Sequence, residues 1–153
     1  MFPAKFFRGF LVAFILFVLL DAFWHGGVLA GFYNQRLMLL NPDLVGVPVG
    51  LSPLLLAVNA VNALALTYFV LMHMDHGRSM ADAAWVGALL GFTVVGTVNG
   101  LNHVLIPGWD MTMAMVDTAW GTCSGIIGAL AVAVVAGRER GGVWGRLLHL
   151  FGR

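Results

Sequence analysis

Residues 11–32 read LVAFILFVLLDAFWHGGVLAGF, and this almost unbroken apolar run decides the fold class of the chain. A stretch of about 20 apolar residues, at a helical rise of about 1.5 Å each, spans the hydrocarbon core of a bilayer. The run exceeds the roughly 7–15 apolar residues of a signal peptide, although Lys5 and Arg8 precede it. We therefore expect a retained first transmembrane helix over residues 9–31.

The composition extends this expectation to the whole chain. Of its 153 residues, 60% are hydrophobic and 10% are charged, and the mean hydropathy is +0.91, whereas a soluble chain carries about 25% charged residues. Further spans are expected at residues 54–74, 83–104 and 112–136. The sequence predicts an all-α, four-transmembrane-helix bundle over residues 1–137, with a basic tail at 138–153 that suits an interfacial helix. The expected partner is the lipid bilayer, and no nucleic-acid partner is expected.

The connecting segments predict the orientation of the bundle. Asparagine, proline and glycine are frequent from Tyr33 to Pro53, which predicts an interfacial loop there, with room for one helical turn at RLMLL, residues 36–40. Four spans place Arg36 alone on one side of the membrane and the other cations on the opposite side: Lys5, Arg8, Arg78, Arg138, Arg140, Arg146 and Arg153. Because cytoplasmic loops carry the excess of lysine and arginine, both termini are predicted to be cytoplasmic. We expect a multi-pass protein of the cell inner membrane.

Small residues predict where helices touch. The pairs Gly87 and Gly91, and Gly121 and Gly125, have the spacing that lets two membrane helices approach closely. The third and fourth spans are therefore expected to pack against each other. Cys123 lies within this small-residue segment and is interpreted as part of the same contact. Such faces also favour a homo-oligomer or docking onto a larger membrane complex.

Polar side chains interrupt the apolar spans at helical spacings. They are Asp21, His25, Asn59, Asn62, Asn99, Asn102, His103 and Asp117. Members of each span lie three or four positions apart and so share a helical face. A charge at the centre of a membrane helix costs about 2.5–3.5 kcal/mol, so such faces turn toward the bundle interior. The sequence predicts one polar cavity open to the outer side, walled by Trp24, Trp109 and Trp120.

Several functions fit such a cavity. The leading interpretation is a non-enzymatic membrane protein that binds a small ligand or cation, as a carrier or accessory subunit. An intramembrane enzyme acting on a lipid would use Asp21 and Asp117 as acid and base. A structural or assembly protein would use the polar residues only to hold its helices together.

A metal or haem site is a further alternative. Asp21, His25, His103 and Asp117 form a ligand set suited to a transition metal, and the two imidazoles would serve as axial ligands of a haem. The methionines of MTMAM, residues 111–115, and the segment MHMDH, residues 72–76, offer soft ligands for Cu(I). However, residues at alternate positions do not share one helical face.

Two segments resemble a known family. LDAFWHGGVLAGFY, residues 20–33, and GLNHVLIPGWDMTMAMVDTAWG, residues 100–121, resemble the hallmarks of an uncharacterised family of small four-helix bacterial membrane proteins, the domain of unknown function DUF2177. The matching residues are Asp21, Trp24, Tyr33, Asn102, Trp109, Asp117, Trp120 and Gly121. The resemblance implies the four-helix topology and no particular activity. Members similar to this chain carry Leu at the positions of His25 and His103 and Asp at that of Asn99, which implies that the histidines were added to a shared core.

Overall fold

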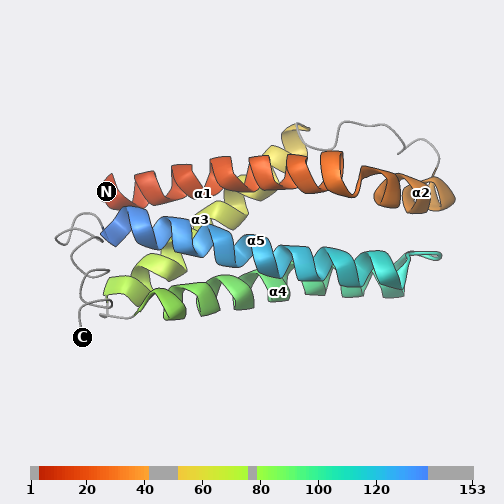
Figure 1. Cartoon of the computed structure of the whole chain (residues 1–153). Coiled ribbons are helices and arrows are strands. Elements are labelled where there is room, and N and C mark those ends of the chain that lie inside the picture. Colours follow the sequence, from red (N-terminus) through yellow and green to blue (C-terminus); the bar gives the residue numbers. More distant parts are fainter. Residues whose placement is uncertain (1–3, 42–51, 76–78, 138–153) are drawn as a thin grey trace.

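The computed structural model describes residues 4–41, 52–75 and 79–137, which form a bundle of helices (Figure 1). In chain order the elements are α1 (Ala4–Phe23), the π-helical turn η1 (Trp24–Val28), α2 (Ala30–Leu40), α3 (Pro53–Asp75), α4 (Met80–Leu105) and α5 (Met111–Gly137). Four segments are long and apolar enough to cross a membrane: Ala4–Val28, Pro53–Met74, Met80–Leu105 and Met111–Val135. The predicted all-α class with four membrane-spanning helices is confirmed.

The helices form a bundle with two distinct ends. α4 lies antiparallel along α5, whereas α1 packs on α3 and α5. α3 runs diagonally, from the last turns of α1 to the first turns of α4 (Figure 1). At the N-terminal end α1 and α4 begin and α3 and α5 finish. The opposite end holds η1, α2 and the turn between α4 and α5, and it is called the cavity end below.

Polar side chains define where the helices begin. Ser79 and Asp82 form a reciprocal capping box at the start of α4, in which the backbone N–H of Ser79 donates to Asp82 Oδ2 over 2.8 Å. At the start of α5, Asp110 Oδ1 accepts from the backbone N–H of Met113 over 2.7 Å. These side chains satisfy backbone donors that the first helical turn leaves without partners.

Glycines bring α4 and α5 into backbone contact, as predicted. A Cβ atom added to Gly91 would collide with the backbone of Gly121, and one added to Gly87 would collide with the backbone of Gly125. Cys123 is exposed, so the interpretation of this residue as part of the contact was wrong. It lies two positions from both Gly121 and Gly125, which turns it about 200° away from their face.

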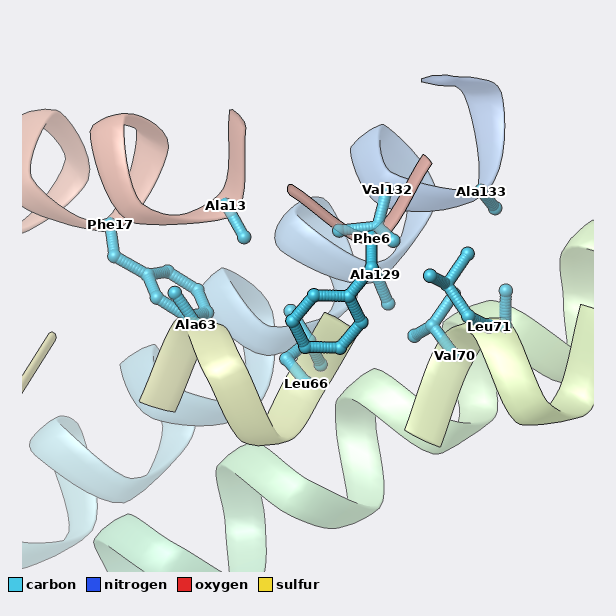
Figure 2. Packing of buried hydrophobic residues seen from close by; sticks show 11 residues of the cluster. Phe6, Ala13, Phe17, Ala63, Leu66, Val70, Leu71, Ala129, Val132 and Ala133 are labelled. Atoms are coloured by element: carbon cyan, nitrogen blue, oxygen red, sulfur yellow. The ribbon is translucent and has the colours of Figure 1, made fainter. Parts of the chain in front are cut away.

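The apolar core fills the N-terminal end of the bundle. Its side chains come from α1, α3, α4 and α5, and Figure 2 shows most of them meeting between α1, α3 and α5: Phe6, Ala13, Phe17, Ala63, Leu66, Val70, Leu71, Ala129, Val132 and Ala133. Where α5 has Gly128, an added Cβ would lie 2.9 Å from Leu66 Cδ2 and 2.9 Å from Phe17 Cε1. These two side chains close the core on the side that faces the cavity end.

The region after the first span differs from the prediction. Residues 33–40 are helical, so the expected loop was wrong over residues 33–35, and the single turn allowed at residues 36–40 is the end of the longer helix α2. Asn34, Gln35 and Arg36 are compatible with a helix, and the proline and glycine residues come only after Asn41. The expected first span of residues 9–31 is not a continuous α-helix either, because η1 interrupts it. Residues 42–51 and the predicted tail at 138–153 lie outside the described residues.

Candidate functional site

A hydrogen-bond network converges on the carboxylate of Asp117 in α5. Tyr33 Oη donates to Asp117 Oδ1 over 3.0 Å, and His25 Nε2 lies 3.1 Å from the same oxygen. Asn99 in α4 donates from Nδ2 to Asp117 Oδ2 over 2.8 Å. The carboxylate therefore joins four elements, η1, α2, α4 and α5. Because three side chains surround it, its charge is compensated within the bundle.

His25 has an acceptor oxygen beside each of its ring nitrogens. Nε2 faces Asp117, and Nδ1 lies 3.3 Å from the backbone oxygen of Asp21. Carboxylate and carbonyl oxygens only accept hydrogen bonds, so the arrangement fits the imidazolium form, in which both nitrogens donate. In that form His25 neutralises Asp117, and neither ring nitrogen is free to bind a metal.

A second carboxylate, that of Asp21, lies at the end of α1. The buried Asn59 of α3 donates from Nδ2 to Asp21 Oδ2 over 3.0 Å. In the part of the chain that the structure describes, Asn59 is the one side chain that hydrogen-bonds this carboxylate. An amide is neutral, so this hydrogen bond brings no compensating charge, and the imidazole of His25, which is hydrogen-bonded to Asp117, is the group that also interacts electrostatically with Asp21.

The π-helical turn sets the position of Tyr33. Leu29 donates its backbone N–H to the carbonyl of Trp24 over 2.9 Å, which is the bond of a π-turn. Nine positions along a regular α-helix would put Trp24 and Tyr33 on opposite faces, since each residue turns the chain by about 100°. The π-turn accommodates one extra residue, so the rotation about the helix axis between Trp24 and Tyr33 is smaller by about 100° than in a regular α-helix. Tyr33 therefore lies on the side of Trp24 and Asp117.

Two tryptophans support the network from one side. The rings of Trp24 and Trp120 are parallel, with an interplanar angle of 0° and centroids 4.2 Å apart. Trp24 Nε1 donates to Tyr33 Oη over 3.3 Å, which fixes the phenol that in turn donates to Asp117. Burial and the nearby Asp117 carboxylate raise the pKa of Tyr33 well above its usual range, so the phenol remains a donor.

A cavity of about 360 Å³ lies between the four spans, toward the cavity end. This volume falls within the range of about 300–1,000 Å³ that small-molecule sites occupy. Its polar lining consists of Asp21, His25, Asn59, Asn62, Asn99 and Asp117. Its apolar lining includes Phe17, Leu55, Val58, Leu66, Leu90, Val94, Val98 and Trp120. The structure thus brings seven of the ten predicted ligand-binding residues, Trp120 included, to one cavity.

The other three predicted residues lie elsewhere. Trp24 stands behind Trp120, and neither Asn102 nor His103 lines the cavity. His103 is exposed, and its Nδ1 lies 3.0 Å from the backbone oxygen of Trp109. Although His103 is one turn beyond Asn99, it belongs to the last turn of α4 and contacts the α4–α5 turn instead of the cavity. Trp109, expected to wall the site, also lies outside the lining.

The predicted metal ligands do not form one group in the structure. Within residues 4–41, 52–75 and 79–137, no three histidine, cysteine, aspartate or glutamate side chains lie so that they would hold a metal ion. His103 is turned toward Trp109 while His25 is bound to Asp117. Of the methionines at the same end, Met113 is buried whereas Met111 and Met115 are exposed, so they do not share a face.

An ion pair fastens α2 to the start of α5. Arg36 Nε donates to Asp110 Oδ1 over 2.8 Å, and the guanidinium carbon lies 3.6 Å from the centroid of the Phe32 ring. Asp110 accepts from Met113 as well, and these hydrogen bonds to Met113 and Arg36 lower the pKa of Asp110. This pair holds α2 in the position from which Tyr33 reaches Asp117.

Tyr33 is a functional residue that the sequence did not place in the site. It was left out because a loop was expected to begin at Tyr33, after the polar residues of the first span. Two sequence signals mark it: the match of Tyr33 to the family hallmark, and the pair Gly26 and Gly27, where a helix is easily distorted. No sequence periodicity indicates the pairing of Arg36 with Asp110, since it depends on the fold of the two turns.

Comparison with known proteins agrees with the resemblance. No curated protein and no solved structure matches the chain. The family described as "Predicted membrane protein (DUF2177)" matches residues 6–134, a stretch that contains the four spans except for residues 4, 5 and 135, and the whole Asp117 network. The chain therefore belongs to the DUF2177 family of predicted membrane proteins.

Proposed function

We propose that the protein binds a small, positively charged ligand in its cavity, and that Asp21 is the counter-ion of this ligand. The observation that carries the proposal is the unequal pairing of the two carboxylates in the lining. Asp117 is hydrogen-bonded to His25, whereas Asp21 is hydrogen-bonded to the neutral Asn59 and shares the single charge of the His25 imidazolium with Asp117. An uncompensated charge at membrane depth costs about 2.5–3.5 kcal/mol. A cationic ligand would supply the missing charge.

Other features of the cavity support the same ligand class. Asn62, three positions after Asn59, lines the cavity and forms no hydrogen bond within the described residues, so its amide is available to a ligand. Trp120 also lines this space, and the face of a tryptophan ring attracts a cation by about 0.5–2 kcal/mol. A carrier or an accessory subunit would use such a site to hold its ligand within the membrane.

Ligand-dependent thermal stability tests this proposal. The protein in lipid nanodiscs would be heated with butylammonium, with butanoate or with butanol, which share a chain length and differ in charge. Butylammonium is expected to raise the unfolding midpoint, because a ligand that binds only the folded state stabilises it by about 2.7 kcal/mol at a hundredfold excess over its Kd. Butanoate and butanol are expected to leave the midpoint unchanged.

Two variants locate the effect. Asp21→Asn keeps the size of the side chain and removes its charge, so the shift with butylammonium should disappear. Asp82→Asn removes a carboxylate at the N-terminal end of the bundle and should keep the shift. An equal shift in Asp21→Asn, or no shift in the unmodified protein with butylammonium, tetramethylammonium or guanidinium, would refute the proposal.

The alternative of an intramembrane acid–base enzyme has weaker support in the geometry. Both oxygens of Asp117 already accept hydrogen bonds, and both nitrogens of His25 face acceptors. Asp21 is the carboxylate with room for a further partner, and a single such group does not form an acid–base pair. The enzymatic, metal-binding and structural interpretations stay predictions.

The orientation and the location are also proposed from sequence. The bias of lysine and arginine supports placing both termini in the cytoplasm, with the cavity end on the outer side of the inner membrane. Labelling of single cysteines with a membrane-impermeant reagent, at Gln35 on the cavity end and at Ala81 on the other end, would test it. We expect reaction at position 35 only, in a background of Cys123→Ala.

A further inference from the structure

One side of the cavity lies between α3 and α4, two helices that diverge toward the cavity end. α4 is packed closely on α5, but it meets α3 only sparsely. Figure 1 shows why: α3 leaves the first turns of α4 and crosses toward the last turns of α1, so α3 and α4 separate toward the cavity end. Residues of both helices line the cavity on this side, among them Val58 of α3 and Val94 and Val98 of α4.

These lining residues also reach the outer surface of the bundle. Val58 is 46% exposed, Val94 is 42% exposed and Val98 is 52% exposed. A residue that lines a cavity and is half-exposed lies at the edge of its opening. The cavity is therefore open sideways, between α3 and α4.

The opening lies at the depth of the hydrocarbon. Val94 precedes the end of α4 at Leu105 by eleven residues, which corresponds to about 16 Å along the helix axis. The hydrocarbon core of a bilayer is about 30 Å thick, so this edge lies near its middle. A molecule at this opening would contact lipid chains rather than water.

The two sides of the cavity have different chemistry. The polar part of the lining consists of the Asp21 carboxylate with Asn59 and Asn62, whereas valine side chains line the opening. A purely polar ligand would leave the apolar edge without contacts, and a purely apolar ligand would leave Asp21 uncompensated. Only a molecule with one charged end and one apolar chain matches both sides.

We propose that the cavity takes an amphiphile with one protonated amine and one hydrocarbon chain, which enters from the bilayer between α3 and α4. The amine pairs with Asp21 and the chain lies across Val58 and Val98 into the surrounding lipid. This inference rests on the proposed function, since it identifies the class of cationic ligand and the route to the same site. An anionic amphiphile is disfavoured by the carboxylate.

Affinity measurements with chain-length pairs test this proposal. Binding of dodecylammonium, butylammonium and the neutral dodecanol would be measured on the full chain in nanodiscs. Because each buried CH₂ group contributes about 0.8 kcal/mol, dodecylammonium should bind at least about tenfold tighter than butylammonium. Dodecanol should bind at least about tenfold more weakly than dodecylammonium. Asp21→Asn should remove the difference between dodecylammonium and dodecanol.

A pair of variants on α4 tests the route. Val98→Trp narrows the opening and should weaken dodecylammonium binding about tenfold while butylammonium binding is retained. Leu101→Trp is the matched control, because Leu101 is 54% exposed on the same helix and does not line the cavity. Both positions are exposed, so both variants are expected to fold.

The outcomes separate this inference from the proposed function. If butylammonium binds as tightly as dodecylammonium, or if Val98→Trp and Leu101→Trp have equal effects, the sideways route is refuted while cation binding stands. If dodecanol equals dodecylammonium, the role of the charge is refuted. If neither amine binds, the proposed function itself is refuted.

Discussion

At the scale of single residues, Asp21 and Asp117 have different roles although both are carboxylates at the same end of the bundle. Asp117 accepts from Tyr33, His25 and Asn99, and every contact comes from another helical element. Asp21 accepts from Asn59 alone among the described residues and borders the cavity. The first carboxylate is placed to hold the bundle together, and the second is placed to meet a ligand.

This difference predicts that the same substitution has effects of different size on stability at the two positions. Asp117→Asn should lower the free energy of unfolding by about 1–3 kcal/mol, because His25 and Tyr33 lose a charged acceptor. Asp21→Asn should change it by less than Asp117→Asn, because one hydrogen bond from an amide can be kept. Thermal unfolding of both variants in the same detergent measures the two effects. A larger loss in Asp21→Asn would contradict the assignment.

At the scale of elements, the contact between α4 and α5 depends on glycine. Gly91→Ala should lower the folded yield and the unfolding midpoint, since its Cβ would collide with the backbone of Gly121, which cannot rotate away as a side chain can. Gly100→Ala is the control on the same helix, because nothing lies within 4 Å of its added Cβ. Replacing that glycine should be neutral or stabilising by up to about 1 kcal/mol. Equal losses in the two variants would contradict the close contact.

The π-turn η1 makes a prediction about helix phase. Deleting Gly31, which lies between η1 and Tyr33, keeps the π-turn and rotates Tyr33 by about 100° away from Asp117. Tyr33 should then lose its hydrogen bond to Asp117, although no contacting side chain was changed. Deleting Gly27 is the control, because it removes the extra residue together with the π-turn, so that an α-helix runs on from α1 and Tyr33 keeps its phase. Nitration of Tyr33, followed in a Tyr68→Phe background because Tyr68 is exposed, should rise in the Gly31 deletion and stay low in the Gly27 deletion.

The Arg36–Asp110 pair predicts how α2 responds to acid. The pKa of Asp110 is lowered in the folded protein, so its contribution to stability is complete above the ordinary carboxyl value of about 3.9 and is lost as the pH falls through the lower folded-state value. α2 should therefore loosen only in strong acid. A distance measured between spin labels on α2 and α5 should lengthen there. In Arg36→Gln this distance should already be longer at neutral pH, and an unchanged distance would show that the pair does not hold α2.

At the scale of the whole molecule, the sequence predicts the four spans and much of the site. Asp21, His25, Asn59, Asn99 and Asp117 meet as expected, because charged and amide groups in membrane helices have no alternative to the bundle interior. Trp24, Asn102 and His103 are the exceptions among the predicted residues, and Tyr33 belongs to the network without having been predicted; His103 and Tyr33 lie at helix ends. Phase along a regular helix cannot indicate that α4 ends two residues after His103 or that η1 rotates Tyr33 inward. The predicted homo-oligomer or larger complex stays a prediction.

The position of the apolar core has a consequence for permeation. Phe17 and Leu66 meet at Gly128 and close the bundle between the cavity and the N-terminal end. The cavity is thus closed toward the N-terminal end, and an ion that reaches Asp21 has no conductive path through the bundle to the opposite leaflet. Liposomes that contain the protein should show no ionic conductance above that of protein-free liposomes. Any transport by this protein would require α1, α3 and α5 to part at the level of Phe17, Leu66 and Gly128.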